Sequence, residues 1–372
     1  MSRKIPFDYW LLVITFVLVL SGIVMVYSSS SIYALQNYHD SYFFLKKQFL
    51  FASLGFIALI VFLLIDYHSY YKIIYPFLFI CLVLMIALLI PGIGHRVGGA
   101  RRWLNLGFFR FQPSEFAKYA LIFYLAYSLS KKEGSMKSFA IGFVPHLIVT
   151  GLFLGLLLLQ PDFGTAVSIA FIVFLMLFAA GTRLSYIISA LIVLVPTACY
   201  LMMSTPYRKK RILAFLNPWE DPANTGFQII QSFLAFYSGN ILGLGLGDGR
   251  QKRFYLPEAH TDFIFSVIGE ELGFMGVMAV IILFVLFLYR GIRISLKAPD
   301  LFGTYLALGI TSLISFQAIT NIAVVMGLLP TKGLALPFLS YGGTSVICNL
   351  AGVGILLNIS AQQQDVSTST YR

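Results

Sequence analysis

The sequence contains few cysteines and few charged side chains, and both shortages restrict the class of protein. Cys81, Cys199 and Cys348 each lie within or beside an apolar run, so a disulfide framework is not expected. Only 11% of the residues are charged, whereas 59% are hydrophobic. Because a soluble globular protein needs more polar surface than this composition supplies, we predict a polytopic membrane protein.

Metal-binding and nucleotide-binding motifs are also missing. The five histidines show no metal-ligand spacing and no Cys-x-x-Cys pattern occurs, which argues against a dedicated zinc site. The glycine-rich segment 243–249 follows no expected strand and precedes no Lys-Ser/Thr pair, so we interpret it as a flexible loop. A divalent cation, Mg or Mn, held by carboxylates and a substrate diphosphate is compatible with the sequence.

Acidic residues are the scarcer of the two charge signs. The 15 Asp and Glu are outnumbered by 26 Lys and Arg, which gives a formal net charge of +11. In a membrane protein this excess favours anionic lipid headgroups or anionic substrates as partners, and argues against nucleic acid.

Apolar runs of membrane-spanning length are abundant by contrast, and they predict an all-α polytopic membrane protein with ten transmembrane helices. The first run lacks a small-residue cleavage signature, so we interpret it as a retained helix. We expect one integral membrane domain over residues 1–361, with a long outer loop over about 204–262, and a disordered cytoplasmic tail over 362–372. The expected helices cover residues 9–27, 48–65, 73–90, 114–129, 139–159, 163–180, 184–203, 263–289, 301–328 and 343–360.

The loops between these helices fall into two groups on opposite sides of the membrane. One group consists of short basic turns, such as residues 130–138, which are typical of a cytoplasmic face. The other group holds nearly all the clusters of Pro, Gly and charged residues. A count of Lys and Arg supports this orientation only when loop 204–262 is left out, because that loop is close to the length limit of about 60 residues for the rule. We therefore expect a site on the outer face.

Asp262 lies where the long outer loop meets the eighth expected helix. At about 100° per residue, a stripe of small residues runs along the helix below this carboxylate. The stripe could admit a neighbouring helix or a lipid chain. Asp262 itself is either a site carboxylate or a helix N-cap above a packing seam. The stripe consists of Ser266, Gly269, Gly273 and Gly276.

Two other segments expected on the outer face carry charged residues that are candidates for the site. Each of these residues also has a purely structural explanation. Glu115 and Lys118 are one helical turn apart, so they form either a helix-stabilising ion pair or part of a polar pocket. Asp162 follows a Pro at a hairpin between two apolar helices, where it caps the second helix or forms a wall of a site.

The segment 328–343 joins the last two expected helices. Its two prolines and its Gly pair prevent a continuous helix, so its backbone must be irregular and either buried in protein or wet. Lys332, Ser340 and Tyr341 then either face a cavity or belong to a loop with a few caps.

Basic residues cluster in the same outer loops. They form either a cationic surface for phosphate-bearing ligands or a contact with anionic lipid headgroups. The candidates are Arg96, Arg101, Arg102 and Arg110, then Arg208, Lys209, Lys210 and Arg211, and then Arg250, Lys252 and Arg253.

Taken together, five segments resemble the SEDS family (shape, elongation, division and sporulation), most closely its FtsW branch. The resemblance covers nearly the whole chain, and one departure is FYSGN at residues 236–240, where the family more often has a Gly-Ser/Ala-Gly-Gly turn. The segments are RRWLNLGFFRFQPSEFAK from Arg101, QPDFGTA from Gln160, RILAFLNPWEDPANTGFQIIQS from Arg211, QKRFYLPEAHTDFIFSVIGEELG from Gln251 and NIAVVMGLLPTKGLALPFLSYGGTS from Asn321.

The resemblance implies a peptidoglycan glycosyltransferase of a bacterial cytoplasmic (inner) membrane that polymerises lipid II at the outer face during cell division and releases undecaprenyl diphosphate. It implies that Asp262 is the catalytic carboxylate. The implied partners are a class B penicillin-binding transpeptidase of the FtsI type and the division complex. Candidates for substrate binding are Arg102, Glu115, Lys118, Asp162, Glu258, His260, Thr261, Lys332, Ser340 and Tyr341, and candidates for diphosphate binding are Arg211, Lys252 and Arg253.

The chemistry of such a transfer is consistent with these residue types. Converting an α-linked sugar diphosphate into a β-1,4 bond is an inverting displacement with an oxocarbenium-like transition state. The acceptor hydroxyl needs a base, whereas cations or a metal ion can stabilise the departing diphosphate. Asp262 is therefore expected to act as the base or as a metal ligand. The alternatives are a lipid II flippase, which needs polar contacts accessible from both faces, and a scaffold that only recruits the transpeptidase.

Overall fold

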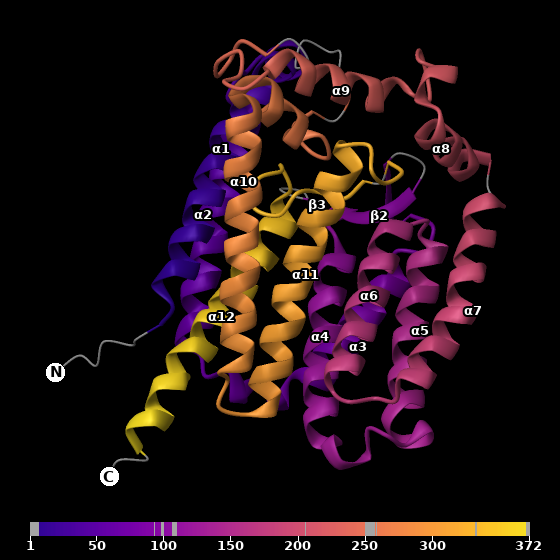
Figure 1. Cartoon of the computed structure of the whole chain (residues 1–372), viewed down its shortest axis with the longest axis vertical. Coiled ribbons are helices and arrows are strands. Elements are labelled where there is room, and N and C mark those ends of the chain that lie inside the picture. Colours follow the sequence, from indigo (N-terminus) through magenta and orange to yellow (C-terminus); the bar gives the residue numbers. More distant parts are fainter. Residues whose placement is uncertain are drawn as a thin grey trace.

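Long apolar helices run side by side through most of the chain (Figure 1). The computed structural model describes residues 7–92, 94–97, 100–105, 110–204, 206–249, 257, 259–331 and 333–369. The bundle helices are α1 (Tyr9–Tyr38), α2 (Phe43–Leu64), α3 (Ile74–Ala87), α4 (Pro113–Lys131), α5 (Val144–Leu159), α6 (Phe163–Ala179), α7 (Leu184–Met203), α10 (Ile264–Leu296), α11 (Leu301–Val325) and α12 (Gly343–Ser369).

These helices confirm the predicted all-α polytopic fold. Among the described residues, seven helices are long and apolar enough to cross a membrane by length and composition, counting α5 together with the π-turn Phe139–Phe143 before it. Helices α3 and α6 are shorter but apolar. Helix α4 is the one that carries the buried Glu115 and Lys118. Each expected span therefore corresponds to a helix.

Helices α1, α10 and α12 extend well beyond their predicted ends, and α10 continues from residue 289 to Leu296. Helix α1 continues past residue 27 to Tyr38, because its polar continuation contains no Pro or Gly, and it stops where His39 adopts a left-handed conformation with φ 57°. Helix α12 continues to Ser369, past its predicted end at residue 360, and the disordered tail expected over 362–372 stays a prediction. This segment also lacks Pro and Gly, and nothing in its sequence ends the helix.

A small antiparallel sheet lies in the loop between α3 and α4. Its strands are β1 (Gly94–Val97), β2 (Ala100–Asn105) and β3 (Arg110–Phe111), in the order β1-β2-β3. Cα pairing includes His95 with Trp103 and Leu104 with Phe111. Apolar periodicity alone did not predict this sheet, because its strands are short and basic.

The long connection between α7 and α10 is largely helical. It contains α8 (Pro206–Leu216), the 3-10 turn η4 (Pro218–Glu220) and α9 (Phe227–Gly239). Helices α8 and α9 lie across the upper end of the bundle in Figure 1. The start of α1 lies at the opposite end, where Arg290 near the end of α10 binds Asp8 and Ser360 of α12 accepts from the Asp8 backbone amide at 3.0 Å.

Helices α11 and α12, together with α4, form the most enclosed part of the bundle. In their most apolar 18-residue stretches, 72% of α11 and 78% of α12 is buried, compared with 6% of α7. Helix α7 lies at the periphery, as Figure 1 shows. The connection between α11 and α12 is therefore attached at both ends to the core of the protein.

Helix α10 is interrupted at Gly273, which has φ 64° and ψ −163°. The break frees backbone groups on both sides, and the preceding loop satisfies them. The carbonyls of Glu270 and Glu271 accept from the amides of Leu244 and Gly245, each at 3.0 Å. In the other direction the amides of residues 274 and 275 donate to the carbonyls of residues 240 and 241 at 2.9 and 3.2 Å. The start of the glycine-rich segment is thus bound to α10, and our interpretation of it as a flexible loop is wrong there.

Candidate functional site

Asp262 lies in the turn just before α10, at the end of the bundle that carries α8, α9 and the sheet. The helix begins at Ile264 with Phe263 at its N-cap, and no side chain caps it. Asp262 is therefore one residue outside the cap position, which removes the simplest structural explanation for this carboxylate. The residue is partly exposed, whereas Phe263 and Ile264 behind it are buried.

The backbone of this turn is held at three consecutive carbonyls. The His260 carbonyl accepts from the backbone amide of Tyr341 at 2.9 Å. The Thr261 carbonyl accepts from the Ser340 hydroxyl at 2.6 Å. The Asp262 carbonyl accepts from the side-chain amide of Asn321 at 2.8 Å. Because all three donors belong to α11 or to the α11–α12 connection, the turn is fixed to the core of the bundle.

The side chain of Asp262 faces the same connection. A Cβ added at Gly333 would lie 3.1 Å from Asp262 Oδ2. The next residue, Leu334, packs against the first turn of α6, where a Cβ at Gly164 would lie 3.3 Å from it. Arg211 of α8 donates to the Thr331 carbonyl at 3.3 Å. Residues 331, 333 and 334 of this connection therefore contact the Asp262 carboxylate, the start of α6 and Arg211, one of the predicted diphosphate-binding cations.

Asp162 is the N-cap of α6. Its carboxylate accepts from the Thr165 backbone amide at 3.3 Å and from the Thr165 hydroxyl at 2.9 Å, which confirms the capping role. Arg102 of β2 lies beside it, with a guanidinium nitrogen 3.9 Å from Asp162 Oδ1 and a hydrogen bond to the Pro161 carbonyl. The pair therefore links the sheet to the α5–α6 hairpin.

Glu115 and Lys118 form a buried ion pair within α4, with Lys118 Nζ 2.7 Å from Glu115 Oε1. Both residues are almost fully enclosed, at 7% and 2% exposure. Among the described residues, the second carboxylate oxygen of Glu115 has no hydrogen-bond partner. One turn along, Tyr119 donates to Asn349 of α12 at 2.9 Å. The pair therefore lies in the interior beside α12, and no hydrogen bond described for the chain joins it to Asp262.

His260 and Tyr341 belong to an aromatic cluster with residues from the first two helices. The His260 ring lies 4.6 Å from the Phe44 ring and 5.7 Å from the Tyr33 ring, between centroids. The Tyr341 ring meets Phe44 edge-on at 5.1 Å. Tyr33 lies in the part of α1 that extends past the predicted helix end, so sequence reasoning missed it.

The stripe of small residues on α10 is covered by α9 and by the loop that follows α9. The Ser266 hydroxyl lies 2.7 Å from that of Ser232, and a Cβ at Gly269 would lie 2.3 Å from the Phe236 ring. Gly273 is similarly close to the backbone of Gly243. The packing-seam interpretation is therefore correct for Ser266, Gly269 and Gly273, and this part of the stripe is not open to a lipid chain.

Four predicted site residues, Glu258, Lys332, Lys252 and Arg253, lie outside the described residues, and their roles stay predictions. Within the described ranges, no group of three or more His, Cys, Asp and Glu side chains could hold a metal ion. A cation at Asp262 would therefore need ligands from elsewhere, such as a substrate diphosphate.

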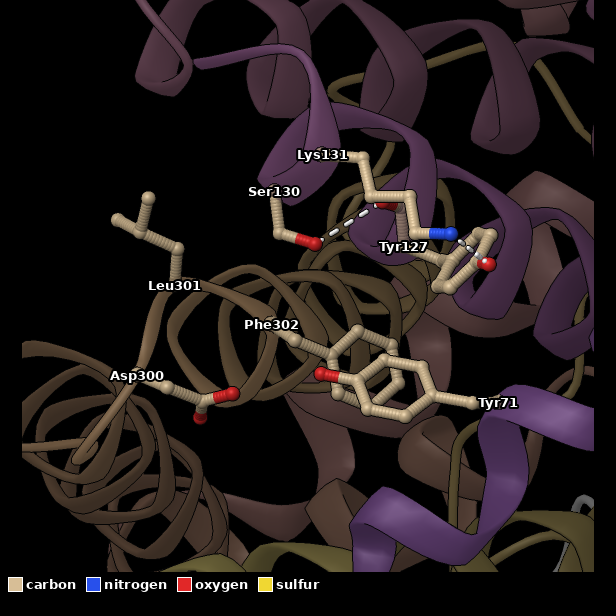
Figure 2. Close-up of a pocket in the computed structure, with 7 residues that line it drawn as sticks. All are labelled: Tyr71, Tyr127, Ser130, Lys131, Asp300, Leu301 and Phe302. Atoms are coloured by element: carbon tan, nitrogen blue, oxygen red, sulfur yellow. Dashed lines mark hydrogen bonds between the residues drawn. The ribbon is translucent and has the colours of Figure 1, made fainter.

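Two open cavities lie at the other end of the bundle. One has a volume of about 610 Å³ and is drawn in Figure 2, where residues at the end of α4 face the start of α11. The second, of about 550 Å³, shares Asp300 with the first. Neither cavity touches the predicted site residues. The first is lined by Tyr71, Tyr127, Ser130, Lys131, Asp300, Leu301 and Phe302.

Comparison with known proteins gives consistent matches over almost the whole chain. The sequence pattern of the FtsW/RodA/SpoVE family, described as "Cell cycle protein", matches residues 9–365. A protein of Geobacter metallireducens named "Probable peptidoglycan glycosyltransferase FtsW" is 51% identical over 358 residues, which is 96% of both chains. Stage V sporulation protein E of Bacillus subtilis is 46% identical over 96% of this chain and 98% of its own.

The fold is also similar to a solved structure. A chain of the structure titled "Structural coordination of polymerization and crosslinking by a peptidoglycan synthase complex" superposes on this protein with a TM-score of 0.79. It shares 32% sequence identity, and the match covers 96% of this chain and 98% of that one.

Proposed function

The chain belongs to the FtsW/RodA/SpoVE family of cell cycle proteins, and from that membership we propose that it is a peptidoglycan glycosyltransferase acting in cell division and cell wall biogenesis. It polymerises lipid II into β-1,4 glycan strands at the outer face of a bacterial inner membrane and releases undecaprenyl diphosphate. One observation carries the proposal beyond family membership: the turn that holds Asp262 is fixed in place. The backbone carbonyls of residues 260, 261 and 262 all accept hydrogen bonds from α11 or from the α11–α12 connection.

Asp262 supplies the base of the reaction in this proposal. Its carboxylate removes the proton from the acceptor sugar hydroxyl while the hydroxyl oxygen bonds to the donor anomeric carbon. The bond from that carbon to the diphosphate oxygen breaks on the opposite side, so the anomeric configuration inverts. General-base assistance of this kind is worth about 10² to 10⁴-fold. The absence of a side chain at Gly333 lets the carboxylate lie close to the backbone of the loop opposite it.

The departing diphosphate requires positive charge. Arg211 is a described cation in contact with this loop, because its guanidinium donates to the Thr331 carbonyl, two residues before Gly333. Lys252 and Arg253 are further proposed contributors. Asp262 would hold a divalent cation, Mg or Mn, only with further ligands from the substrate diphosphate, and the cation would supply charge stabilisation to the leaving group.

The proposed partners are a class B penicillin-binding transpeptidase of the FtsI type and the division complex. Support comes from the similar chain of a peptidoglycan synthase complex studied for the coordination of polymerization and crosslinking. A polymerase whose strands are crosslinked as they grow needs such a transpeptidase on the same side of the membrane as its carboxylate.

Purified protein tests the proposal. Wild type and Asp262→Asn are incubated with labelled lipid II and Mg²⁺ or Mn²⁺, with and without the cognate transpeptidase, and products are resolved by size. Asp248→Asn, which alters an exposed carboxylate of the same long loop, is the matched control. We expect glycan ladders from wild type and the control, and none from Asp262→Asn.

Folded Asp262→Asn that polymerises lipid II at the normal rate would contradict the assignment. Movement of labelled lipid II across liposomes without any ladder would favour the flippase. A scaffold would instead support growth with Asp262 replaced.

A further inference from the structure

Asn321 occupies an unusual position for a polar residue near the end of a membrane helix. It is 1% exposed, and its side-chain nitrogen donates to two separate segments: to the Asp262 carbonyl at 2.8 Å and to the Leu334 carbonyl at 2.6 Å. Its side-chain oxygen has no hydrogen-bond partner among the described residues. Because a buried unsatisfied oxygen is unfavourable by about 1–3 kcal/mol, the packing of an apolar helix does not explain this residue.

The double donation joins the two sides of the site. Asp262 contributes the carboxylate, and Leu334 directly follows Gly333, the residue that this carboxylate faces. One amide group therefore sets the separation between the turn that carries the carboxylate and the loop opposite it. A rigid side chain with two donors is suited to that role, since both hydrogens are directed within one plane.

Ser340 makes the adjacent connection. Its hydroxyl accepts from the Leu336 backbone amide at 2.8 Å and donates its only hydrogen to the Thr261 carbonyl at 2.6 Å. The residue is 2% exposed. Because the only hydroxyl hydrogen of Ser340 is already donated to the Thr261 carbonyl, it is not free for a substrate. The contact with Thr261 therefore explains the presence of Ser340 better than the substrate contact we expected.

We infer that Asn321 and Ser340 are positioning residues that hold the Asp262 carboxylate at its working distance from the 333–336 loop. This inference rests on the proposed function, in which Asp262 is the base. Neither side chain touches the reacting atoms; each acts through the backbone of the turn. Misplacement of a reacting group by about 1 Å can cost about 10²-fold in rate, so loss of either hydrogen bond is expected to lower kcat more than it changes KM.

The test uses the full-length protein in complex with its transpeptidase and labelled lipid II. Asn321→Ala is expected to lower kcat by about 10 to 100-fold with KM for lipid II within about threefold, and Ser340→Ala by about tenfold. Because the two side chains fix the same turn, the double variant is expected to lose less than the product of the single losses. Ser315→Ala is the matched control: its hydroxyl is buried in α11 and has no hydrogen-bond partner in the described chain, so kcat should stay at the wild-type value.

Melting temperature and binding of the transpeptidase are measured on every variant, and kcat is normalised to folded protein. If Asn321→Ala fails to fold, Ser340→Ala decides the question alone. Folded variants with wild-type kcat, or with a raised KM and unchanged kcat, would overturn the positioning role. That failure is distinct from failure of the proposed function, which would appear as full activity of Asp262→Asn.

Discussion

Gly333 faces Asp262 so closely that a methyl group at position 333 would lie 3.1 Å from the carboxylate oxygen Oδ2. The separation is tighter than an ordinary van der Waals contact, and the carboxylate would have to move by a few tenths of an ångström to accept it. The pair therefore links a glycine in the α11–α12 connection to the geometry of the proposed base.

Gly333→Ala is expected to lower polymerisation by about tenfold without loss of folding, because a small displacement of the base weakens its alignment with the acceptor hydroxyl. The measurement is kcat with labelled lipid II. Gly342→Ala is the control, since a Cβ there would meet only Ser345 at 3.8 Å. Equal activity of Gly333→Ala and Gly342→Ala would show that this space is not used.

Gly269→Ala is expected to destabilise the protein by about 1–3 kcal/mol, because the new methyl group would overlap the Phe236 ring where α9 covers α10. The measurement is the melting temperature in detergent. Gly151→Ala adds the same group in α5 with no atom within 4 Å, and it should leave the melting temperature unchanged or slightly raised. A similar fall for both variants would argue against a close seam between α9 and α10.

Arg290→Ala is expected to destabilise the end of the bundle opposite Asp262 by about 1–3 kcal/mol, since it removes charge-assisted hydrogen bonds. Arg290 Nε lies 3.1 and 2.9 Å from the two Asp8 carboxylate oxygens. Melting temperature is again the measurement, and Arg293→Ala, at an exposed position three residues on, is the control. If both variants melt alike, the Asp8 contact contributes no stability.

The loss of stability in acid is expected to depend on Asp66, the N-cap residue of the 3-10 turn η1 (Tyr67–Lys72) between α2 and α3. Burial raises the pKa of this carboxyl, but hydrogen bonds from Gln362 and His68 outweigh it and leave the pKa below its ordinary value. A lowered folded-state pKa stabilises the protein above the unfolded value of about 3.9, and the effect is lost as pH falls through the folded value. The melting temperature of Asp66→Asn should therefore lie below that of wild type at pH 7, and the two should converge in acid. A difference independent of pH would contradict this account.

Removal of divalent cations with a chelator is expected to stop glycan synthesis while leaving the melting temperature unchanged. The reason is that the described residues contain no cluster able to hold a metal without substrate, so the cation would arrive with the diphosphate. The two measurements are made on the same sample before and after re-addition of Mg²⁺. A fall in melting temperature on chelation would indicate a resident structural metal instead.

The positions of the helices could be predicted because apolar length is a local property of the sequence. The ends of α1 and α12 could not, because polar residues without Pro or Gly permit a helix without requiring one. Asp262 could be found from its place between loop and helix, together with the family motif around it.

The contacts around Asp262 could not be predicted in the same way. Asn321 gave a usable signal, a polar amide inside an apolar run, but its partners at residues 262 and 334 are set by tertiary structure. Ser340 was singled out, yet the sequence does not reveal that its hydroxyl points at the backbone of Thr261. Tyr33 gave no signal, since it lies beyond the expected end of the first helix.

The interruption of α10 at Gly273 has a mechanical consequence. A continuous helix transmits a push along its axis from one side of a membrane to the other, but a helix with a non-helical residue inside it does not. The short segment that begins at Ile264 is attached sideways, to residues 244 and 245 of the preceding loop and to α9, and residues 240 and 241 of the same loop bind the helix beyond the break. Force applied to that loop by a bound protein would enter α10 at the break, while the far end of the helix is held separately by the contact of Arg290 with Asp8.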